Sequence, residues 1–330
     1  MQRSPTRALI ATLVLAACGA AAQAQQISVN GLLDISAGRT KAPGGTSITG
    51  VDSGKMSTSW YGFSGSEDLG GGLTASFRLD AFLQLDAGTM GRFGGDAYFA
   101  RNSYVGLAGK SWGSVTVGRN TTALFVTTLL NNAFGDSFGF SPSIRHYFTS
   151  GTVTGDTGWN DSLAYNSPNI GGFSFGAMTA LKEAGNGGNW SLNAGYGAGP
   201  LSLSAVVQNV KKDISGTVPV QDSRTWQAAA SFGLTKDTRL FAQYGQVDNK
   251  STGADYKITG LGAKVGMGAG AVLAQYSHVS ASVGGNRNTY TLGYDHFLSK
   301  RTDVYAAAMI DKQDGKSSGN GYSVGMRHRF

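Results

Sequence analysis

The end of the chain is the feature that most restricts its fold. Residues 321–330 alternate between two kinds of side chain and finish on the aromatic Phe330. Successive side chains of a strand point to opposite faces, so one face of this segment is mostly apolar and the other is polar. A strand that meets lipid on one face and a watery lumen on the other has this pattern, and it predicts an outer-membrane barrel.

The same alternation recurs from Ile27 onward, for example in residues 73–80, 201–205, 225–232 and 290–295. Each segment is about ten residues long, which is the length that a tilted strand needs to cross a bilayer. The chain has room for roughly 16 such strands with their connections. We therefore predict an all-β fold, a transmembrane antiparallel up-and-down β-barrel of about 16 strands.

Short and long connections alternate along the chain. The short ones are turn-like, such as 68–72, 109–113 and 298–301, and the long polar ones are 38–54, 85–96, 120–158, 213–222, 281–287 and 313–319. Barrels of this class have short turns at one membrane face and longer loops at the other. Because no linker interrupts the alternation, we expect residues 25–330 to form a single barrel domain.

The first residues have the pattern of a secretory signal. Arg3 and Arg7 precede a short apolar core at 9–17, and 22–24 form a small-residue cleavage site. We expect residues 1–24 to be a cleaved signal peptide. Cys18 is the only cysteine and lies within this segment, so the mature chain would have no disulfide. The sequence 15–18 also resembles a bacterial lipid-attachment site, which leaves lipidation of Cys18 open.

Composition agrees with strands and tight turns. The chain has 50 glycines and 6 prolines in 330 residues, a glycine share about twice the average, with no collagen period. After residue 24, no apolar run reaches the roughly 18 residues of a transmembrane helix. Tyrosines near the expected strand ends, among them Tyr147 and Tyr305, suggest an interfacial aromatic girdle, although tyrosine also favours strands in general.

Several segments, taken in order, resemble the trimeric general porins of Gram-negative bacteria, particularly the beta-proteobacterial type. They are 29–34, 61–73, 101–107, 118–120, 163–169, 298–302 and the terminal strand to Phe330. The resemblance implies a homotrimer in the bacterial outer membrane, in contact with the lipid bilayer and lipopolysaccharide. It also implies passive diffusion of small hydrophilic solutes and ions. In this family the terminal aromatic, here Phe330, helps the outer-membrane assembly machinery to recognise the chain.

The resemblance further implies that the third long loop folds into the lumen and narrows it. Residues 120–158 form the longest connection and fit this role. We expect a short helix over 122–131, packed on the inner wall, and bends at Gly135 and Gly139. A loop that instead covers the mouth of the barrel is the alternative.

Charged residues on the wall and the loop are the candidate lining of this constriction. Arg101 matches a wall arginine of the family, and strand parity places Arg78 on the inner face. The complete predicted set is Arg78, Asp80, Arg101, Arg119, Asp136 and Arg145. Sequence parity leaves the directions of Arg119 and Arg145 open.

Two departures from the family pattern affect the expected selectivity. Trp60 stands where such porins commonly have a wall arginine, and Asn132 stands where similar loops carry an acid. The first change weakens the positive side and the second weakens the negative side. The remaining arginines still exceed the acids, and a few charges decide which ions enter a narrow passage. We expect a weak to moderate preference for anions.

Other chemistries find no support in the sequence. The four histidines are scattered, which argues against a metal site, and no nucleophile elbow of the form Gly-x-Ser-x-Gly occurs. A glycine-rich segment at 266–271 lacks a following helix and is better explained as a turn. Basic residues are dispersed, and Arg327 and Arg329 would point into the lumen, which argues against nucleic-acid binding. We expect no enzyme, cofactor or metal; an outer-membrane barrel with an adhesin or enzymatic role is the alternative.

Overall fold

The computed structural model describes residues 26–153, 156–181, 188–211 and 222–330. The predicted signal peptide at 1–24, with Cys18, lies outside these ranges. The strands in them are β1 (Gln26–Lys41), β2 (Ser47–Ser53), β3 (Trp60–Gly70), β4 (Leu73–Gln84), β5 (Thr89–Met90), β6 (Asn102–Gly109), β7 (Gly113–Thr121), β8 (Gly158–Asn166), β9 (Phe173–Ala180), β10 (Asn189–Ala198), β11 (Leu201–Val210), β12 (Ser223–Gly233), β13 (Thr238–Asn249), β14 (Ala254–Met267), β15 (Gly270–Ala281), β16 (Arg287–Phe297), β17 (Thr302–Gln313) and β18 (Gly319–Arg329).

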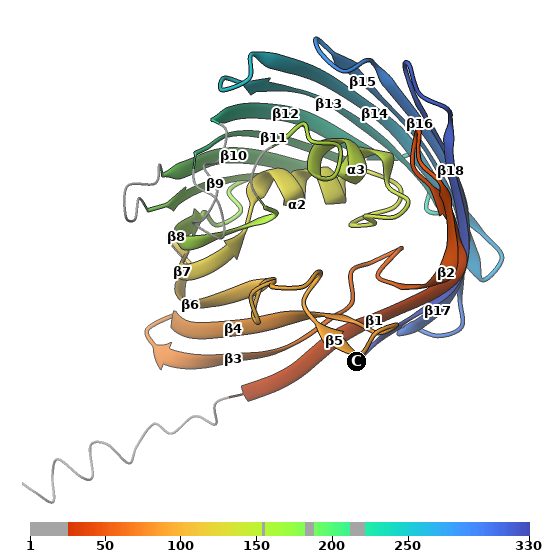
Figure 1. Ribbon diagram of the computed structural model, residues 1–330. Coiled ribbons are helices and arrows are strands. Elements are labelled where there is room, and N and C mark those ends of the chain that lie inside the picture. The colour runs from red at the N-terminus through yellow and green to blue at the C-terminus, as the bar shows by residue number, and fades with distance from the viewer. Residues whose placement is uncertain (1–25, 154–155, 182–187, 212–221) are drawn as a thin grey trace, which may run out of the picture.

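The strands form one antiparallel sheet that closes into a barrel, because β1 pairs with β18 (Figure 1). The 18 labelled strands of the described residues occupy about 16 positions around the barrel. β2 pairs with the second half of β1 and β3 with its first half, so together they fill one position. β5 pairs only with the end of β4, while the rest of β4 pairs with β6, so β5 adds no further position. The predicted barrel is confirmed.

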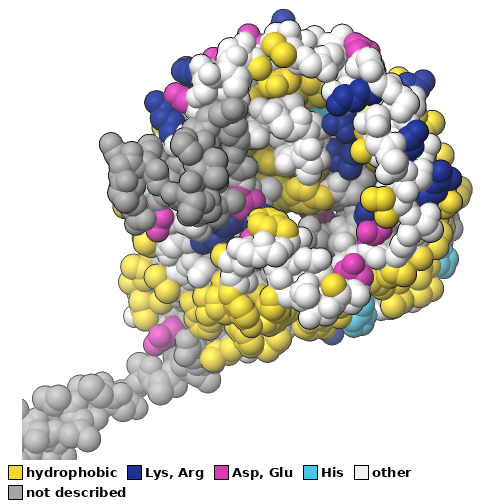
Figure 2. All heavy atoms as spheres, viewed as in Figure 1, with side chains coloured by type: hydrophobic (Ala, Val, Ile, Leu, Met, Phe, Trp, Pro, Cys, Tyr) yellow, Lys and Arg dark blue, Asp and Glu magenta, His cyan; other side chains and the backbone are white. Residues whose placement is uncertain are grey.

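The alternation that predicted the strands separates an outer from an inner face. In β12, Trp226 and Phe232 are exposed on the outside, while Gln227 and Ser231 are buried on the inside. In β18, Tyr322 points outward and Arg327 inward in the same way. Hydrophobic side chains accordingly gather along the lower and right outer edges of the molecule in Figure 2. A lipid-facing outer wall and a polar lumen require this arrangement.

One expected loop is shorter than predicted. The polar segment 38–54 was expected to be a loop, but β1 runs to Lys41 and β2 begins at Ser47, with register pairs from Ile35–Ser53 to Lys41–Ser47. Thr, Ser and Gly residues made this hairpin look like a loop. Antiparallel pairing of β1 with β2 nevertheless satisfies the backbone hydrogen-bonding groups of the segment, and this stabilises it as a hairpin.

The third loop lies inside the barrel, as predicted, and carries two helices (Figure 1). These are α2 (Ala123–Leu130) and α3 (Pro142–Phe148). The side chains of Thr122 and Ser141 cap their N-termini by accepting hydrogen bonds from Phe125 N and Ile144 N, which satisfies otherwise unpaired donors. No helix in the described ranges is long and apolar enough to cross a membrane.

The third loop rests on an apolar part of the inner wall. Leu124 of α2 and Tyr147 of α3 are fully buried against Val247, Ile258 and Val279, which come from β13, β14 and β15. Close approach depends on small wall residues; a Cβ added at Gly245 would lie 2.3 Å from Tyr147 Oη. Tyr147 was expected near the aromatic girdle, and this prediction was wrong because its ring anchors the loop to the wall.

Candidate functional site

Polar side chains of the wall fix the helices of the third loop. Gln243 Nε2 donates to the carbonyl oxygens of Thr128 and Asn131, at 3.0 and 2.5 Å. Gln275 Nε2 donates to Ser143 Oγ at 2.7 Å. His146 contacts Ser277 Oγ and Thr289 Oγ1 through its two ring nitrogens, at 3.0 and 2.8 Å. Burial lowers the pKa of His146 to about 3, so the ring is neutral and structural.

The tip of the loop reaches the opposite side of the lumen. Ser57 Oγ donates to Asp136 Oδ1 at 2.9 Å, and Arg327 Nη1 donates to Ser57 Oγ at 3.1 Å. Burial raises the pKa of the Asp136 carboxyl above its ordinary value, and the Ser57 hydrogen bond with the charges of Arg101 and Arg327 offsets only part of this. Asp136 therefore protonates more readily than an ordinary carboxylate.

A second group of charged side chains stands on the inner face of β4 and just before β6. Arg78 Nε and Arg101 Nη1 both donate to Asp80 Oδ2, at 2.6 and 2.8 Å, and Asn102 Nδ2 donates to the same atom at 2.9 Å. The Asp80 side chain is 2% exposed, whereas those of Arg78 and Arg101 are 34% and 31% exposed. One buried acid thus supports two arginines that face the lumen.

Trp60 lies beside these arginines. The Arg101 guanidinium carbon is 4.1 Å from the centre of the indole ring, and that of Arg78 is 5.5 Å away. Trp60 pairs with Phe82 across β3 and β4, so its side chain shares the inner face with Arg78 and Asp80. We call Trp60, Arg78, Asp80 and Arg101 the arginine shelf.

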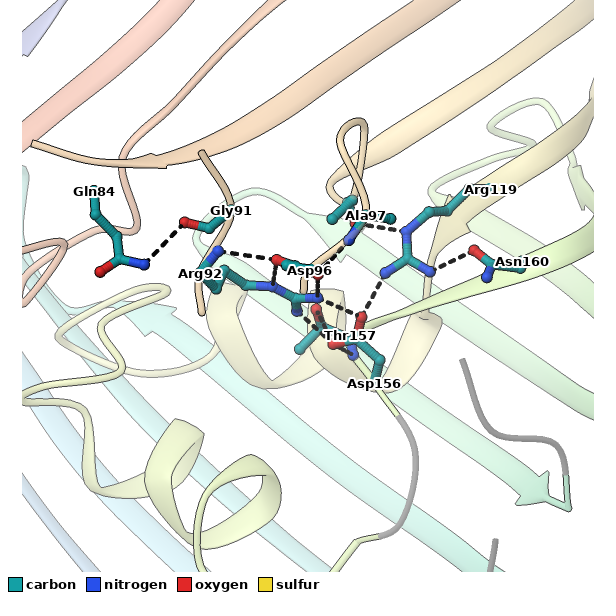
Figure 3. Close-up of polar contacts among 10 residues, drawn as sticks. Gln84, Gly91, Arg92, Asp96, Ala97, Arg119, Asp156, Thr157 and Asn160 are labelled. Carbon is teal, nitrogen blue, oxygen red and sulfur yellow. Dashed lines mark hydrogen bonds and ion pairs between the residues drawn. The ribbon is translucent and has the colours of Figure 1, made fainter. Parts of the chain in front are cut away.

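The two ends of the third loop are held by a different cluster, drawn in Figure 3. Arg92, in the second loop between β4 and β6, donates to both oxygens of Asp96 and to both oxygens of Asp156 at 2.6 to 2.9 Å. Arg119 donates to Asp156, to Asn160 Oδ1 at 2.7 Å and to the Ala100 carbonyl at 2.5 Å. We call Arg92, Asp96, Arg119 and Asp156 the loop latch.

The charges of the loop latch are balanced and have little exposure to solvent. Its ionised side chains are between 4% and 16% exposed. Burial by itself would raise the pKa of the Asp96 and Asp156 carboxyls, but the hydrogen bonds and charge of Arg92 outweigh it and hold both below their ordinary values. The latch remains ionised wherever ordinary carboxylates are ionised.

The remaining predicted residue, Arg145, lies on α3 and faces the β16–β17 wall. Its Nη2 is 3.3 Å from Asp311 Oδ2, and Arg287 donates to both oxygens of the same carboxylate at 2.7 and 2.5 Å. Asp311 is fully buried, while Arg145 and Arg287 are partly exposed. This repeats the arrangement of the arginine shelf, with an acid behind and two arginines in front.

The structure thus divides the six predicted residues among separate clusters. Arg78, Asp80 and Arg101 come together in the arginine shelf, Asp136 lies at the loop tip, and Arg145 lies on α3 against Asp311 of β17. Arg119 does not join the shelf. A register shift between Gly118 and Asn120 interrupts the alternation beside it, and its side chain is 6% exposed within the loop latch.

Sequence reasoning missed a fourth acid–arginine cluster, on β16–β18. Arg327 donates to Asp303 Oδ1 at 2.7 Å and to Asp295 Oδ2 at 2.5 Å, and Arg329 donates to Asp303 Oδ2 at 2.7 Å. With Ser57 and Asp136, these residues line a cavity of about 670 Å³ at the turn end of the barrel. Strand parity already placed Arg327 and Arg329 inside and could have been extended to Asp303.

The charged clusters do not form a metal site. No group of three or more histidine, cysteine, aspartate or glutamate side chains suited to a metal ion occurs in the part of the chain that the structure describes. The grouped acids face arginines, which occupy the coordination that a cation would need. The arrangement is suited to guiding ions through the hollow that Figure 2 shows at the centre of this face.

Comparison with known proteins gives a consistent result. The sequence profile of a family described as "Gram-negative porin" matches residues 10–316. Outer membrane porin protein 32 of Delftia acidovorans is 31% identical over 358 residues, which cover 98% of this chain and 99% of that protein. An outer membrane porin protein of Bordetella pertussis is 26% identical, over 98% of this chain and 100% of that protein.

Solved structures agree with the sequence matches. A structure described as an anion-selective porin from Comamonas acidovorans superimposes with a TM-score of 0.79 and 26% identity, over 93% of this chain and 100% of that one. OmpT of Vibrio cholerae, in a trimer form, has a TM-score of 0.70 at 15% identity, over 93% of this chain and 100% of that one. The second likeness concerns the fold alone.

Proposed function

The chain belongs to the Gram-negative porin family, which makes it a channel of the bacterial outer membrane rather than an enzyme, and we propose that its narrowest passage prefers anions. Such a channel passes small hydrophilic solutes and ions by passive diffusion through its water-filled lumen. We propose that the third loop, residues 120–158, narrows this lumen.

One observation carries the proposed preference. Outside the loop latch, the carboxylate at the centre of each acid–arginine cluster lies behind and the guanidinium groups lie in front. The side chains of Asp80, Asp303 and Asp311 are 0 to 2% exposed, whereas Arg78, Arg101 and Arg329 are 31 to 42% exposed. A passing ion meets N–H groups first, so even paired charges favour an anion at short range.

The predicted lining residues take different roles in this proposal. Arg78, Arg101 and Arg145 would face the passing ion, with Asp80 behind the first two. Asp136 would supply a local negative charge at the loop tip. Arg119 would act indirectly, by holding the base of the third loop. The balance of exposed arginines against one loop acid supports a weak rather than a strong preference.

Assembly follows the family pattern in this proposal. We propose that residues 1–24 are removed on export, that three copies associate in the membrane, and that the terminal strand with Phe330 is read by the assembly machinery. Phe330 is 42% exposed on the outer face, where a partner could reach its ring. Lipopolysaccharide would contact the outer wall at the loop end.

Reversal potentials across a KCl gradient test the preference. With refolded protein in a planar bilayer, the reversal potential should have the sign of the chloride equilibrium potential. A reversal potential with the sign of the potassium equilibrium potential would contradict the proposal. Conductance steps in multiples of three and heat-modifiable mobility on gels would support a trimeric barrel. Single, unit-sized steps would contradict the trimer but leave the channel intact.

A further inference from the structure

The arginine shelf has a chemical character that simple anion preference does not require. Its floor is the flat indole of Trp60, with the Arg101 guanidinium carbon at 4.1 Å from the ring centre. Guanidinium groups stack on aromatic faces, and the outer face of a stacked guanidinium remains available to a second flat group. Attraction of chloride alone does not require such a stack.

The shelf is fixed in place by its surroundings. Asp80 accepts from Arg78, Arg101 and Asn102 at 2.6 to 2.9 Å. A Cβ added at Gly62 would lie 2.2 Å from Asp80 Oδ1, so the absence of a side chain there lets the carboxylate lie across β3. The two arginines are therefore held in a set geometry instead of sampling the lumen freely, which lowers the cost of binding a ligand.

Donors remain available on the lumen side. Among the described residues, Arg78 uses only Nε for its ion pair with Asp80, so both terminal nitrogens can donate to a carboxylate. Arg101 uses only Nη1 in the same way. The two arginines share a single ion-pair partner, which leaves an excess positive charge beside the half-buried Trp60. Bidentate arginine–carboxylate contacts are among the stronger charged hydrogen bonds.

Apolar groups border the shelf on the same inner face. Trp60 pairs with Leu32 on one side and with Phe82 on the other. A ligand that offers a carboxylate to the arginines and a flat ring to Trp60 and the Arg101 guanidinium would match each of these surfaces. An aliphatic acid would match the charge but not the flat stack.

From this geometry we propose that Trp60, Arg78 and Arg101 form a binding subsite within the channel for small aromatic carboxylates. The inference rests on the proposed channel function and makes it more specific, because it separates aromatic anions from other anions of similar size. Trp60 and Arg101 would stack with the ring, and Arg78 would receive the carboxylate.

Current block tests the subsite. Chloride current through the refolded channel is measured while benzoate, cyclohexanecarboxylate or acetate is added at constant ionic strength. Benzoate and cyclohexanecarboxylate have similar size and charge, but only the first has an aromatic face. We expect the half-blocking concentration of benzoate to be about threefold to tenfold lower than that of cyclohexanecarboxylate, as cation–π and stacking contributions imply.

Substitutions assign the effect to Trp60. Trp60→Leu should bring the half-blocking concentration of benzoate close to that of cyclohexanecarboxylate, and Trp60→Phe should keep part of the difference. Trp226→Leu is the matched control, because Trp226 is exposed on the outer wall, and it should leave both values unchanged. Heat-modifiable mobility checks that each variant is folded.

Two results would overturn the subsite. Equal block by benzoate and cyclohexanecarboxylate in the unsubstituted channel would show no aromatic recognition. A Trp60→Leu variant that changes block by all three anions by the same factor would assign Trp60 to positioning the arginines alone. Failure of the anion preference itself is separate, since it would already appear in KCl before any blocker is added.

Discussion

The loop latch and the arginine shelf are built from the same two charged residue types, yet they differ in balance and in exposure. The latch has two arginines and two aspartates, none with a side chain more than 16% exposed, and each guanidinium meets an acid directly. The shelf has two arginines on one buried aspartate, and both arginines are about one-third exposed. The first arrangement holds the chain in place, and the second presents charge to the lumen.

The comparison teaches that the number of arginines near a pore does not determine its selectivity. Buried, fully paired charges have little influence on a passing ion, but removing one partner leaves the other uncompensated. Exposed arginines with the acid behind them act in the opposite way: they contribute less to stability and more to the local field. Substitutions in the two clusters should therefore change different measurements.

The largest effect is expected in the latch. Asp156→Asn would leave Asp96 to Arg92 alone and remove the ion-pair partner of Arg119, and breaking a buried pair costs about 3 kcal/mol or more. The temperature at which the barrel loses its heat-modifiable mobility should fall clearly. Asp237→Asn is the control, because its pair with Lys236 is exposed at 3.8 Å and should contribute less than about 1 kcal/mol. Equal behaviour of the two variants would refute the stabilising role of the latch.

A change of selectivity is expected from the shelf. The double variant Arg78→Gln, Arg101→Gln removes both partly exposed charges of the shelf. If this changes the free-energy difference between chloride and potassium in the narrow passage by about 1 kcal/mol, the chloride-to-potassium permeability ratio should fall roughly fivefold. Reversal potentials measure this ratio. Arg224→Gln removes a charge from the exposed outer side of β12 and should change it little. A ratio that stays constant in the double variant would remove the shelf from the lining.

The smallest effect concerns pH and the tip of the third loop. Because burial raises the pKa of Asp136, its negative charge should be lost as pH falls toward and through a value above the ordinary 3.8. Loss of that charge should increase anion preference by about twofold. Asp96 and Asp156, with lowered pKa, stay ionised in this range and keep the latch closed.

Asp136→Asn provides the check on this pH effect. The variant should already have the higher anion preference at neutral pH, and its reversal potential should change little on mild acidification. The same pH dependence in the variant and the unsubstituted channel would assign the effect to another group.

The fold was predictable because the bilayer imposes a simple rule on every strand. Trp226 and Phe232 must face lipid and Gln227 must not, so alternation alone identifies the wall. The helix expected over 122–131 was also confirmed in outline by α2. Tyr305 shows the limit of the rule: it was expected in the girdle, but its ring lies inside and its hydroxyl donates to the buried Asp34 at 2.8 Å.

The site was less predictable, because contacts across the lumen have no sequence period. Parity placed Arg78 inside, but nothing near Arg92 indicated that it would meet Asp156, 64 residues away along the chain. Arg119 was ambiguous because a register shift interrupts its strand at that point. Long-range pairs of this kind depend on where a loop turns, which is decided by packing such as that of Tyr147 on Gly245.

The closing seam has a consequence for how this chain is put together. Gly31 N donates to Phe330 O at 3.0 Å, and Phe330 N donates to Gly31 O at 3.1 Å, so the final residue belongs to the join itself. Until the β1–β18 pairing has formed, each of these two strands exposes a row of unpaired backbone amide and carbonyl groups. Because the first and last strands of the barrel meet at the turn end, we expect a circular permutation to be tolerated. A short linker would join the present ends of the barrel, and the new termini would lie in another tight turn.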